Sequence, residues 1–157
     1  MTKLTHFDGK GSARMVDVSG KSLTEREAVA RGSVSMKKET LRLIRDEKIA
    51  KGDVLGVARI AGIMAAKKTP EIIPLCHPLN ISSVDISFEF EPKEGRIIIE
   101  AKVKITGRTG VEMEALTAVA AAALTIYDMC KSADKAMIIS DILLAEKRGG
   151  RSGLFRR

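Results

Sequence analysis

A cysteine and a histidine stand side by side in the stretch EIIPLCHPLNIS, residues 71–82, with Pro74 and Pro78 on either side. These side-chain types suit metal binding or nucleophilic catalysis. A structural zinc site needs four such ligands, whereas the chain holds two cysteines and two histidines in no recognisable spacing. Adjacent residues of an extended chain point to opposite sides, which disfavours Cys76 as a nucleophile with His77 as its base.

Two interpretations of this loop stay open. Proline restricts its own backbone and that of the preceding residue, so Pro78 holds His77 extended and Pro74 stiffens the entry. The loop is either a stiff turn with a purely structural role, or a rigid rim that presents the His77 imidazole and backbone donors to a ligand.

Two carboxylates, Glu112 and Glu114, begin an alanine-rich helix that we predict from about Gly110 to Lys131. The helix dipole favours negative charge in this first turn. The spacing of Thr109 and Glu112 predicts a capping box. Capping accounts for Glu112 better than for Glu114.

Asp128 and Lys131 lie near the other end of this helix, three residues apart and therefore neighbours on one helix face. They form either a surface ion pair or an acid/base pair. Glu114 and Asp128 share a face but lie about 21 Å apart along the helix axis. Within one subunit they are too far apart for both to contact the same small reacting group. A site shared between subunits or a long ligand would join them. The small residues between them suit packing on another helix or on the chain's own sheet.

Length and composition indicate a single domain, residues 1–157, because 157 residues with 45% hydrophobic content fill one core. No apolar run approaches the roughly 18 residues of a membrane span, and no signal-peptide core is present. We therefore expect a cytoplasmic protein with no membrane partner, whose two cysteines are thiols. Residues 1–22 are predicted to form a polar arm.

The net charge of +7 is concentrated near the C-terminus. The stretch KRGGRSGLFRR, residues 147–157, holds five basic residues and no acidic one. We predict that it forms a basic, flexible tail. The tail is either simply solvated or suited to an anionic partner.

The elements that position these residues follow from apolar spacing. We predict strands over residues 28–36, 84–91, 96–106 and 136–147, and helices over 37–49, 53–67 and 110–131, with Asp53 as a cap. The turn PKEG joins the two middle strands as an antiparallel hairpin. The order is an α+β, ferredoxin-like split β-α-β-β-α-β pattern with an extra helix and an antiparallel sheet.

Longer motifs give the chain a resemblance to a known family. The segments MVDVS, KGDV, ARIAGI, IPLCHPL, TGVEMEALTA and ALTIYDMCK occur in this order between about His6 and Gly153. With them the chain resembles molybdenum cofactor biosynthesis protein C, the family of cyclic pyranopterin monophosphate synthases. The family's usual GGKSG reads GGRSG here, where Arg151 keeps the charge but changes its geometry.

The resemblance implies an activity and an assembly. Members convert a cyclised GTP, 3',8-cyclo-7,8-dihydroguanosine triphosphate, into cyclic pyranopterin monophosphate with release of pyrophosphate. They use acid/base chemistry and no redox cofactor, and the resemblance leaves open whether magnesium accompanies the pyrophosphate. The expected assembly is a homohexamer, a trimer of dimers, with active sites at subunit interfaces.

The resemblance also implies site residues. Asp128 matches the catalytic residue, with Lys131 and Lys51 as its acid/base partners. The expected substrate contacts are Leu75, Cys76, His77, Glu112, Met113 and Glu114. The leaving pyrophosphate needs cations. Candidates for that role are His77, Lys67, Lys147 and Arg26.

A nucleic-acid-binding module is the alternative class, because a ferredoxin-like sheet with a basic tail also describes RNA-recognition domains. Such sheets offer aromatic platforms on which bases stack. Aromatic residues make up only 3% of this chain, and Phe88 and Phe90 are predicted to face the core. We therefore expect no nucleic-acid partner.

Overall fold

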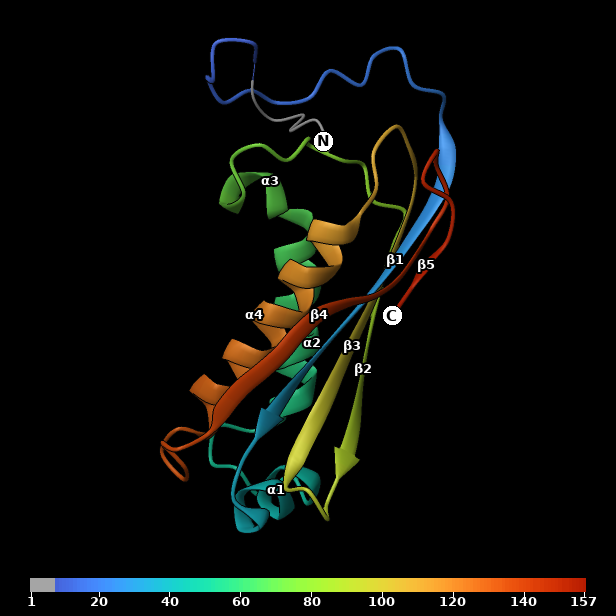
Figure 1. The fold of residues 1–157 in the computed structure, drawn as a ribbon. Helices are drawn as coiled ribbons and strands as arrows, with labels where there is room; N and C mark the ends of the chain where they lie inside the picture. Colours follow the sequence, from blue (N-terminus) through green and yellow to red (C-terminus); the bar gives the residue numbers. More distant parts are fainter. Residues whose placement is uncertain (1–7) are drawn as a thin grey trace.

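A five-stranded antiparallel sheet forms the frame of the molecule in our computed structural model, which describes residues 8–157 (Figure 1). In chain order the elements are β1 (Thr24–Ser35), α1 (Lys38–Arg45), α2 (Val54–Lys67), α3 (Thr69–Ile72), β2 (Ser83–Glu91), β3 (Arg96–Gly107), α4 (Glu112–Cys130), β4 (Ile138–Arg148) and β5 (Phe155–Arg156). The strand order is β2-β3-β1-β4-β5. Its first four strands have the ferredoxin-like arrangement, so the predicted fold class is confirmed.

The hairpin of β2 and β3 follows from its sequence pattern. Every second residue of β3 from Ile97 to Ile105 is buried, and the residues between them are exposed or half-buried. Ile86 of β2 is buried on the same side. Gly95 closes the turn with a φ of 67°, a conformation that glycine adopts without strain. One face of this hairpin therefore belongs to the core, as predicted.

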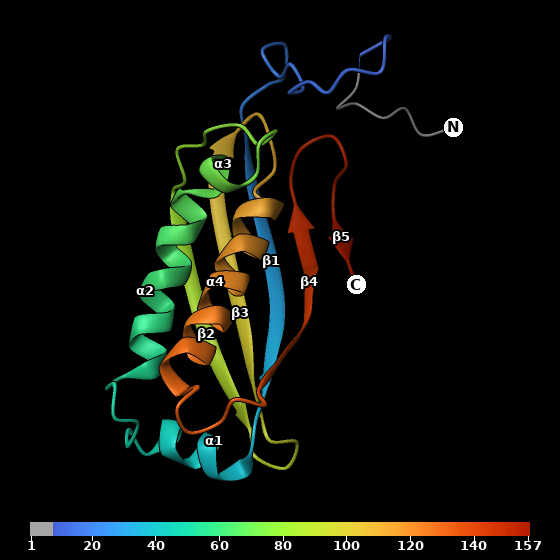
Figure 2. The same ribbon diagram turned by 90° about the vertical axis from the view of Figure 1, so that its left-hand side faces the viewer.

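Helices α2 and α4 cover that face of the sheet (Figure 2). Helix α4 contacts β1, β3 and β4, and α2 contacts α4 and β2. Helix α4 is long and apolar enough to cross a membrane by length and composition alone. Its alanines 115, 118, 122 and 123 are fully buried in the core, which accounts for this apolar character.

The two helices are tightly packed against each other at Gly62 of α2. A Cβ at this position would lie 2.9 Å from the backbone oxygen of Ala118 and closer still to the Ile86 side chain. Only glycine fits such an approach. The small residues on both helices therefore fix how α4 sits on the sheet.

The structure differs most from the sequence prediction at β1, α1 and α3. Strand β1 begins at Thr24, before the predicted residue 28, because its pairing with β3 continues to Gly107. Helix α1 ends at Arg45, before the predicted residue 49, since Glu47 takes a φ of 52°, outside the helical region. The short helix α3 was not predicted, and Pro70 lies in its first turn. Asp53 caps α2 as predicted, accepting from the Gly56 N–H at 2.8 Å.

The sheet extends into the segment predicted as a flexible tail. Strand β4 continues to Arg148, so Lys147 and Arg148 belong to the sheet, which corrects the tail's predicted start. The chain then turns at Gly149 and Gly150, with φ of 89° and 74°, the region that glycine favours. Strand β5 returns beside β4.

The Gly62 contact is testable through Gly62→Ala. The added methyl group must push α2 away from α4 or from β2, so we expect the free energy of unfolding to fall by about 1–3 kcal/mol. Urea denaturation at a fixed protein concentration measures this change. Gly9→Ala is the control, because a Cβ there meets no atom within 4 Å, and it should change stability by less than about 0.5 kcal/mol. Equal stability of the Gly62→Ala variant and the parent would contradict the close approach.

Candidate active site

The loop that carries Cys76 and His77 encloses, with the beginning of α4, a cavity of about 310 Å³, which we call the α4 N-terminal cavity. Six of the residues predicted as substrate contacts line it: Leu75, Cys76, His77, Glu112, Met113 and Glu114. The arm contributes Val16, Val18 and Lys21 to the same lining. Segments far apart in the sequence therefore meet at this cavity.

His77 links the loop to the arm. Its Nε2 lies 2.7 Å from the backbone oxygen of Val16. A carbonyl oxygen only accepts hydrogen bonds, so Nε2 carries the proton and donates. The part of the predicted arm that the structure describes, residues 8–22, runs over the loop that follows α3 (Figure 1). The part over residues 1–7 lies outside the described residues.

The carboxylate of Glu114 is buried, and the residue is 3% exposed. Burial raises its pKa, and the neighbouring Glu112 raises it further. Burial also raises the pKa of the Cys76 thiol, with a smaller contribution from the charge of Glu114. Cys76 is therefore a neutral thiol near pH 7, which disfavours it as a nucleophile.

The predicted capping box is wrong. The N-cap of α4 is Val111, and no side chain caps the helix. Glu112 instead pairs with Lys147 of β4, with 2.9 Å between Nζ and Oε1. The hydroxyl of Thr109 is buried without a partner in the described part of the chain and belongs to the cavity lining. Because the sequence suggested a capping role for Thr109, its place in the cavity was missed.

Asp128, Lys131 and Lys51 form a second cluster, at the far end of α4. The Lys131 ammonium donates to Asp128 Oδ1 at 2.7 Å, and that of Lys51 to Oδ2 at 3.2 Å. Lys51 also donates to the Asp128 backbone oxygen at 2.9 Å, so it is held by two acceptors. The three predicted catalytic residues are therefore brought together, although Lys51 comes from the loop between α1 and α2.

We call the cluster of Asp128, Lys131 and Lys51 the lysine-flanked aspartate. Its opposite charges stabilise one another. The hydrogen bonds from Lys131 and Lys51 lower the pKa of Asp128, and Asp128 raises the pKa of Lys131. At neutral pH the cluster is one carboxylate between two ammonium groups. All three side chains are exposed, so they are accessible to a ligand.

The two clusters lie at opposite ends of α4 (Figure 1). The helix rise places Glu114 and Asp128 about 21 Å apart in one subunit, as the sequence predicted. Helix α4 is regular throughout, so its ends cannot approach each other.

The remaining predicted residues lie elsewhere. Lys67 is exposed at the last turn of α2 and is not part of the cavity lining. Arg26 of β1 lines a neighbouring hollow together with Lys21. Lys21 lines both spaces and was not predicted, because an isolated lysine in a polar arm gives no pattern.

Within residues 8–157, Cys130 lies apart from Cys76 and His77. Cys76 and His77 line the α4 N-terminal cavity, whereas Cys130 is buried at the end of α4, where burial raises its pKa to about 11. Both cysteines are free thiols. His6 lies outside the described residues. Among residues 8–157 no three histidine, cysteine or acidic side chains are grouped as metal ligands.

A ferredoxin-like subunit with a carboxylate-lined cavity and a lysine-flanked aspartate fits an enzyme that moves protons on a polar small molecule. A sequence model of the MoaC family matches residues 15–150, and the chain belongs to that family. It is 61% identical over 157 residues to the cyclic pyranopterin monophosphate synthase of Pelotomaculum thermopropionicum, covering 100% of this chain and 92% of that protein.

Two further relatives carry the same name. The protein of Heliobacterium modesticaldum is 63% identical over 157 residues, covering 100% of this chain and 99% of the relative. That of Desulfitobacterium hafniense is 64% identical over 155 residues, covering 99% and 94%. The family predicted from the sequence motifs is confirmed.

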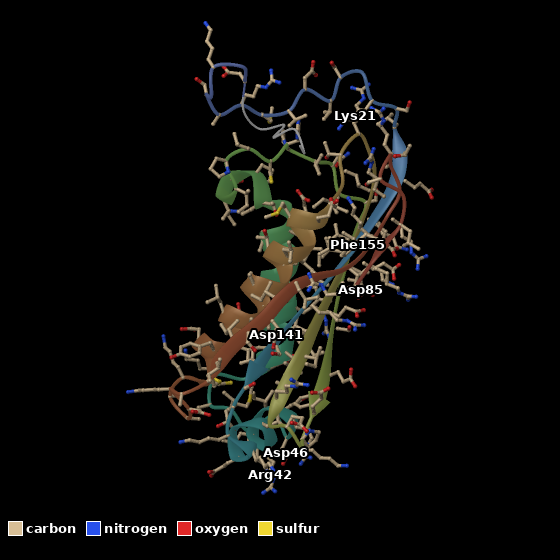
Figure 3. The ribbon with its side chains drawn as sticks, in the orientation of Figure 1. Lys21, Arg42, Asp46, Asp85, Asp141 and Phe155 are labelled. Atoms are coloured by element: carbon tan, nitrogen blue, oxygen red, sulfur yellow. The ribbon has the colours of Figure 1, made fainter. Side chains whose placement is uncertain are left out.

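The coupling between Asp128 and Lys131 predicts a pKa change in Asp128→Asn. Because the Asp128 carboxylate raises the pKa of Lys131, its neutralisation should lower that pKa, and Lys131 should lose its proton at lower pH. An NMR titration with lysine labelled at Cε measures this value directly. Asp85→Asn, on the exposed part of β2, is the control and should leave Lys131 unchanged (Figure 3). An unaltered Lys131 titration in Asp128→Asn would rule out the coupling.

Proposed function

We propose that this protein is a cyclic pyranopterin monophosphate synthase of molybdenum cofactor biosynthesis. It converts 3',8-cyclo-7,8-dihydroguanosine triphosphate into cyclic pyranopterin monophosphate and releases pyrophosphate. Relatives of that name share 61–64% identity with nearly the whole chain, which supports the assignment. The observation that carries it is the grouping of Asp128, Lys131 and Lys51 into one hydrogen-bonded cluster.

The α4 N-terminal cavity takes the ring system of the substrate in this proposal. A guanine-derived ring presents N–H donors, which carboxylates accept. Glu112 and the buried Glu114 supply such acceptors, and the unpartnered hydroxyl of Thr109 supplies a further polar contact. His77 is fixed by its bond to Val16 and keeps Nδ1 for the ligand.

The lysine-flanked aspartate moves protons. Opening a nitrogen heterocycle, forming a new ring and closing a cyclic phosphate all require protons to move to and from nitrogen and oxygen. The lysines are protonated and can donate to a leaving nitrogen or oxygen. Asp128 is ionised, positions both ammonium groups and can take a proton back. Its lowered pKa makes it a weak base until the substrate draws the lysines away.

Two copies of the chain complete one site. A two-fold axis across the middle of α4 exchanges its ends and brings the Asp128 cluster of one subunit beside the α4 N-terminal cavity of another. The outer surface of the helix layer is apolar and suits such contact, because Val57, Ile60 and Met64 of α2 and Leu124 of α4 are 43–65% exposed. This pair would be the dimer from which a homohexamer, a trimer of dimers, is built.

Turnover of the cyclised GTP by the purified protein, with chromatographic detection of the pterin product and pyrophosphate, tests the proposed function. Asp128→Asn should lower the rate by roughly 10²- to 10⁴-fold, the loss typical of a general acid or base. Cys76→Ser is the matched variant, and it should keep most of the activity because the thiol is neutral and not a nucleophile.

Two outcomes would count against this account. If the assembled parent protein forms no product from the cyclised GTP, the proposed activity is contradicted. Asp128→Asn turnover within about threefold of the parent, or roughly 0.7 kcal/mol of barrier, would remove the catalytic role of Asp128. Thermal unfolding and size-exclusion chromatography show whether each variant is folded and assembled as the parent is.

A further inference from the structure

Asp134 is a buried carboxylate that the proposed reaction does not use. It lies in the turn between α4 and β4 and is 2% exposed, although its neighbours Ala133 and Lys135 are exposed. Buried charges in proteins are normally paired or held by hydrogen bonds. None of the ion pairs within residues 8–157 includes Asp134, so its hydrogen bonds must account for its burial.

These hydrogen bonds connect two segments of the chain. The Oδ2 atom of Asp134 accepts from the backbone N–H of Lys37 at 2.9 Å and lies 3.5 Å from the Thr40 hydroxyl. The Oδ1 atom accepts from the N–H of Ala136, in the same turn, at 3.0 Å. The backbone N–H of Asp134 donates to the Cys130 oxygen at the end of α4 at 3.0 Å. Asp134 therefore joins the end of α4 to the start of α1, and Figure 2 shows these two segments side by side.

The Asp134 carboxylate supplies an acceptor that the N-terminus of α1 lacks. The first N–H groups of a helix have no partner inside the helix. The N-cap residue of α1 is Lys37, and its side chain does not cap the helix. Asp134 accepts the N–H of this residue, as the glutamate of a capping box does, and the helix dipole favours its charge. The hydrogen bond from Lys37 lowers the pKa of Asp134, so the carboxyl is ionised at neutral pH.

The same two segments carry the lysine-flanked aspartate. Asp128 lies in the last turn of α4, and Lys51 lies in the loop between α1 and α2. The N–H of Lys48 donates to the Leu43 oxygen at 2.8 Å, which ties this loop to α1. The position of α1 therefore sets where the Lys51 ammonium meets Asp128. Apolar packing of α1 is not directional, whereas hydrogen bonds hold it in one place relative to α4.

We infer that Asp134 is a positioning residue, whose carboxylate holds α1 against the end of α4 so that the Lys51 ammonium stays within hydrogen-bond distance of Asp128. The catalytic consequence of this contact rests on the proposed function, whereas the geometric consequence does not. Asp134 is buried and acts through Lys51. Its loss should affect the rate more than substrate binding, because the α4 N-terminal cavity lies at the other end of α4.

Carbodiimide cross-linking of Lys51 to Asp128, with the product identified by mass spectrometry, tests this position without any turnover. The Lys51 Nζ and Asp128 Oδ2 atoms lie 3.2 Å apart. The Glu112–Lys147 pair, at 2.9 Å, gives the reference yield. Asp134→Asn should lower the Lys51–Asp128 yield by roughly three- to tenfold, because the loss of one hydrogen bond shifts an equilibrium by about that factor. The reference yield should not change.

Lys37→Pro removes the same hydrogen bond from its other side. Lys37 has a φ of −60°, which proline adopts, so the substitution deletes the N–H and leaves the backbone in place. The cross-link yield should fall as in Asp134→Asn, and the double variant should be little worse than either single variant, since both remove one contact. Lys37→Ala is the matched control. It removes the exposed side chain but keeps the N–H, so it should give the parent's yield.

Turnover of the cyclised GTP gives a second measurement. Asp134→Asn should lower kcat by roughly ten- to a hundredfold and leave KM within about threefold of the parent's value. Ile105→Val is the control for stability. Ile105 is buried in β3, near the end of that strand that pairs with the start of β1. This variant should lower the melting temperature but keep the cross-link yield and kcat of the parent.

The outcomes separate positioning from the proposed function and from a purely structural role. If the parent turns over the cyclised GTP but Asp134→Asn and Lys37→Pro keep the parent's yield and kcat, Asp134 does not position Lys51, and the function stands. If both variants lose the Lys51–Asp128 cross-link and the parent shows no turnover, the positioning stands and the function fails. An equal fall of the yield in Ile105→Val would reduce the effect to lost stability and overturn the inference.

Discussion

Helix α4 holds the two clusters of the candidate site at a fixed separation because its alanine face is packed between the sheet and α2. The contact at Gly62 leaves no room for a side chain, so close packing holds the helix in one position. Its two ends therefore stay a fixed distance apart. The α4 N-terminal cavity and the lysine-flanked aspartate are therefore kept apart within one subunit. In the proposed function, a second copy of the chain supplies the missing end to a small substrate.

The two ends of α4 provide different environments for ionisable side chains. At the N-terminal end, burial raises the pKa of the Glu114 carboxyl and that of the Cys76 thiol, so both groups favour their neutral forms. At the other end exposed lysines keep Asp128 ionised.

Much of the fold could be predicted from the sequence, because alternation in β2 and β3 and the helical spacing in α2 report burial directly. The Asp128–Lys131 contact was also predictable, since three-residue spacing fixes neighbours on a helix. Other features depend on long-range contacts that no local pattern encodes. Glu112 was predicted to form a capping box with Thr109, but it pairs instead with Lys147 on a distant strand. Lys21 acquires its place only because the arm crosses the cavity.

The most direct test of the shared site is zero-length cross-linking of carboxylates to amines with a carbodiimide, in a mixture of ¹⁴N- and ¹⁵N-labelled protein after subunit exchange. Glu112 and Lys147 lie 2.9 Å apart and give an internal control within one chain. Glu114 and Lys131 are about 25 Å apart on one helix, beyond the reach of such a bond. We predict mixed-isotope cross-links between peptides carrying Glu112 or Glu114 and those carrying Lys131 or Lys51. The Glu112–Lys147 product alone, despite proven subunit exchange, would contradict the account.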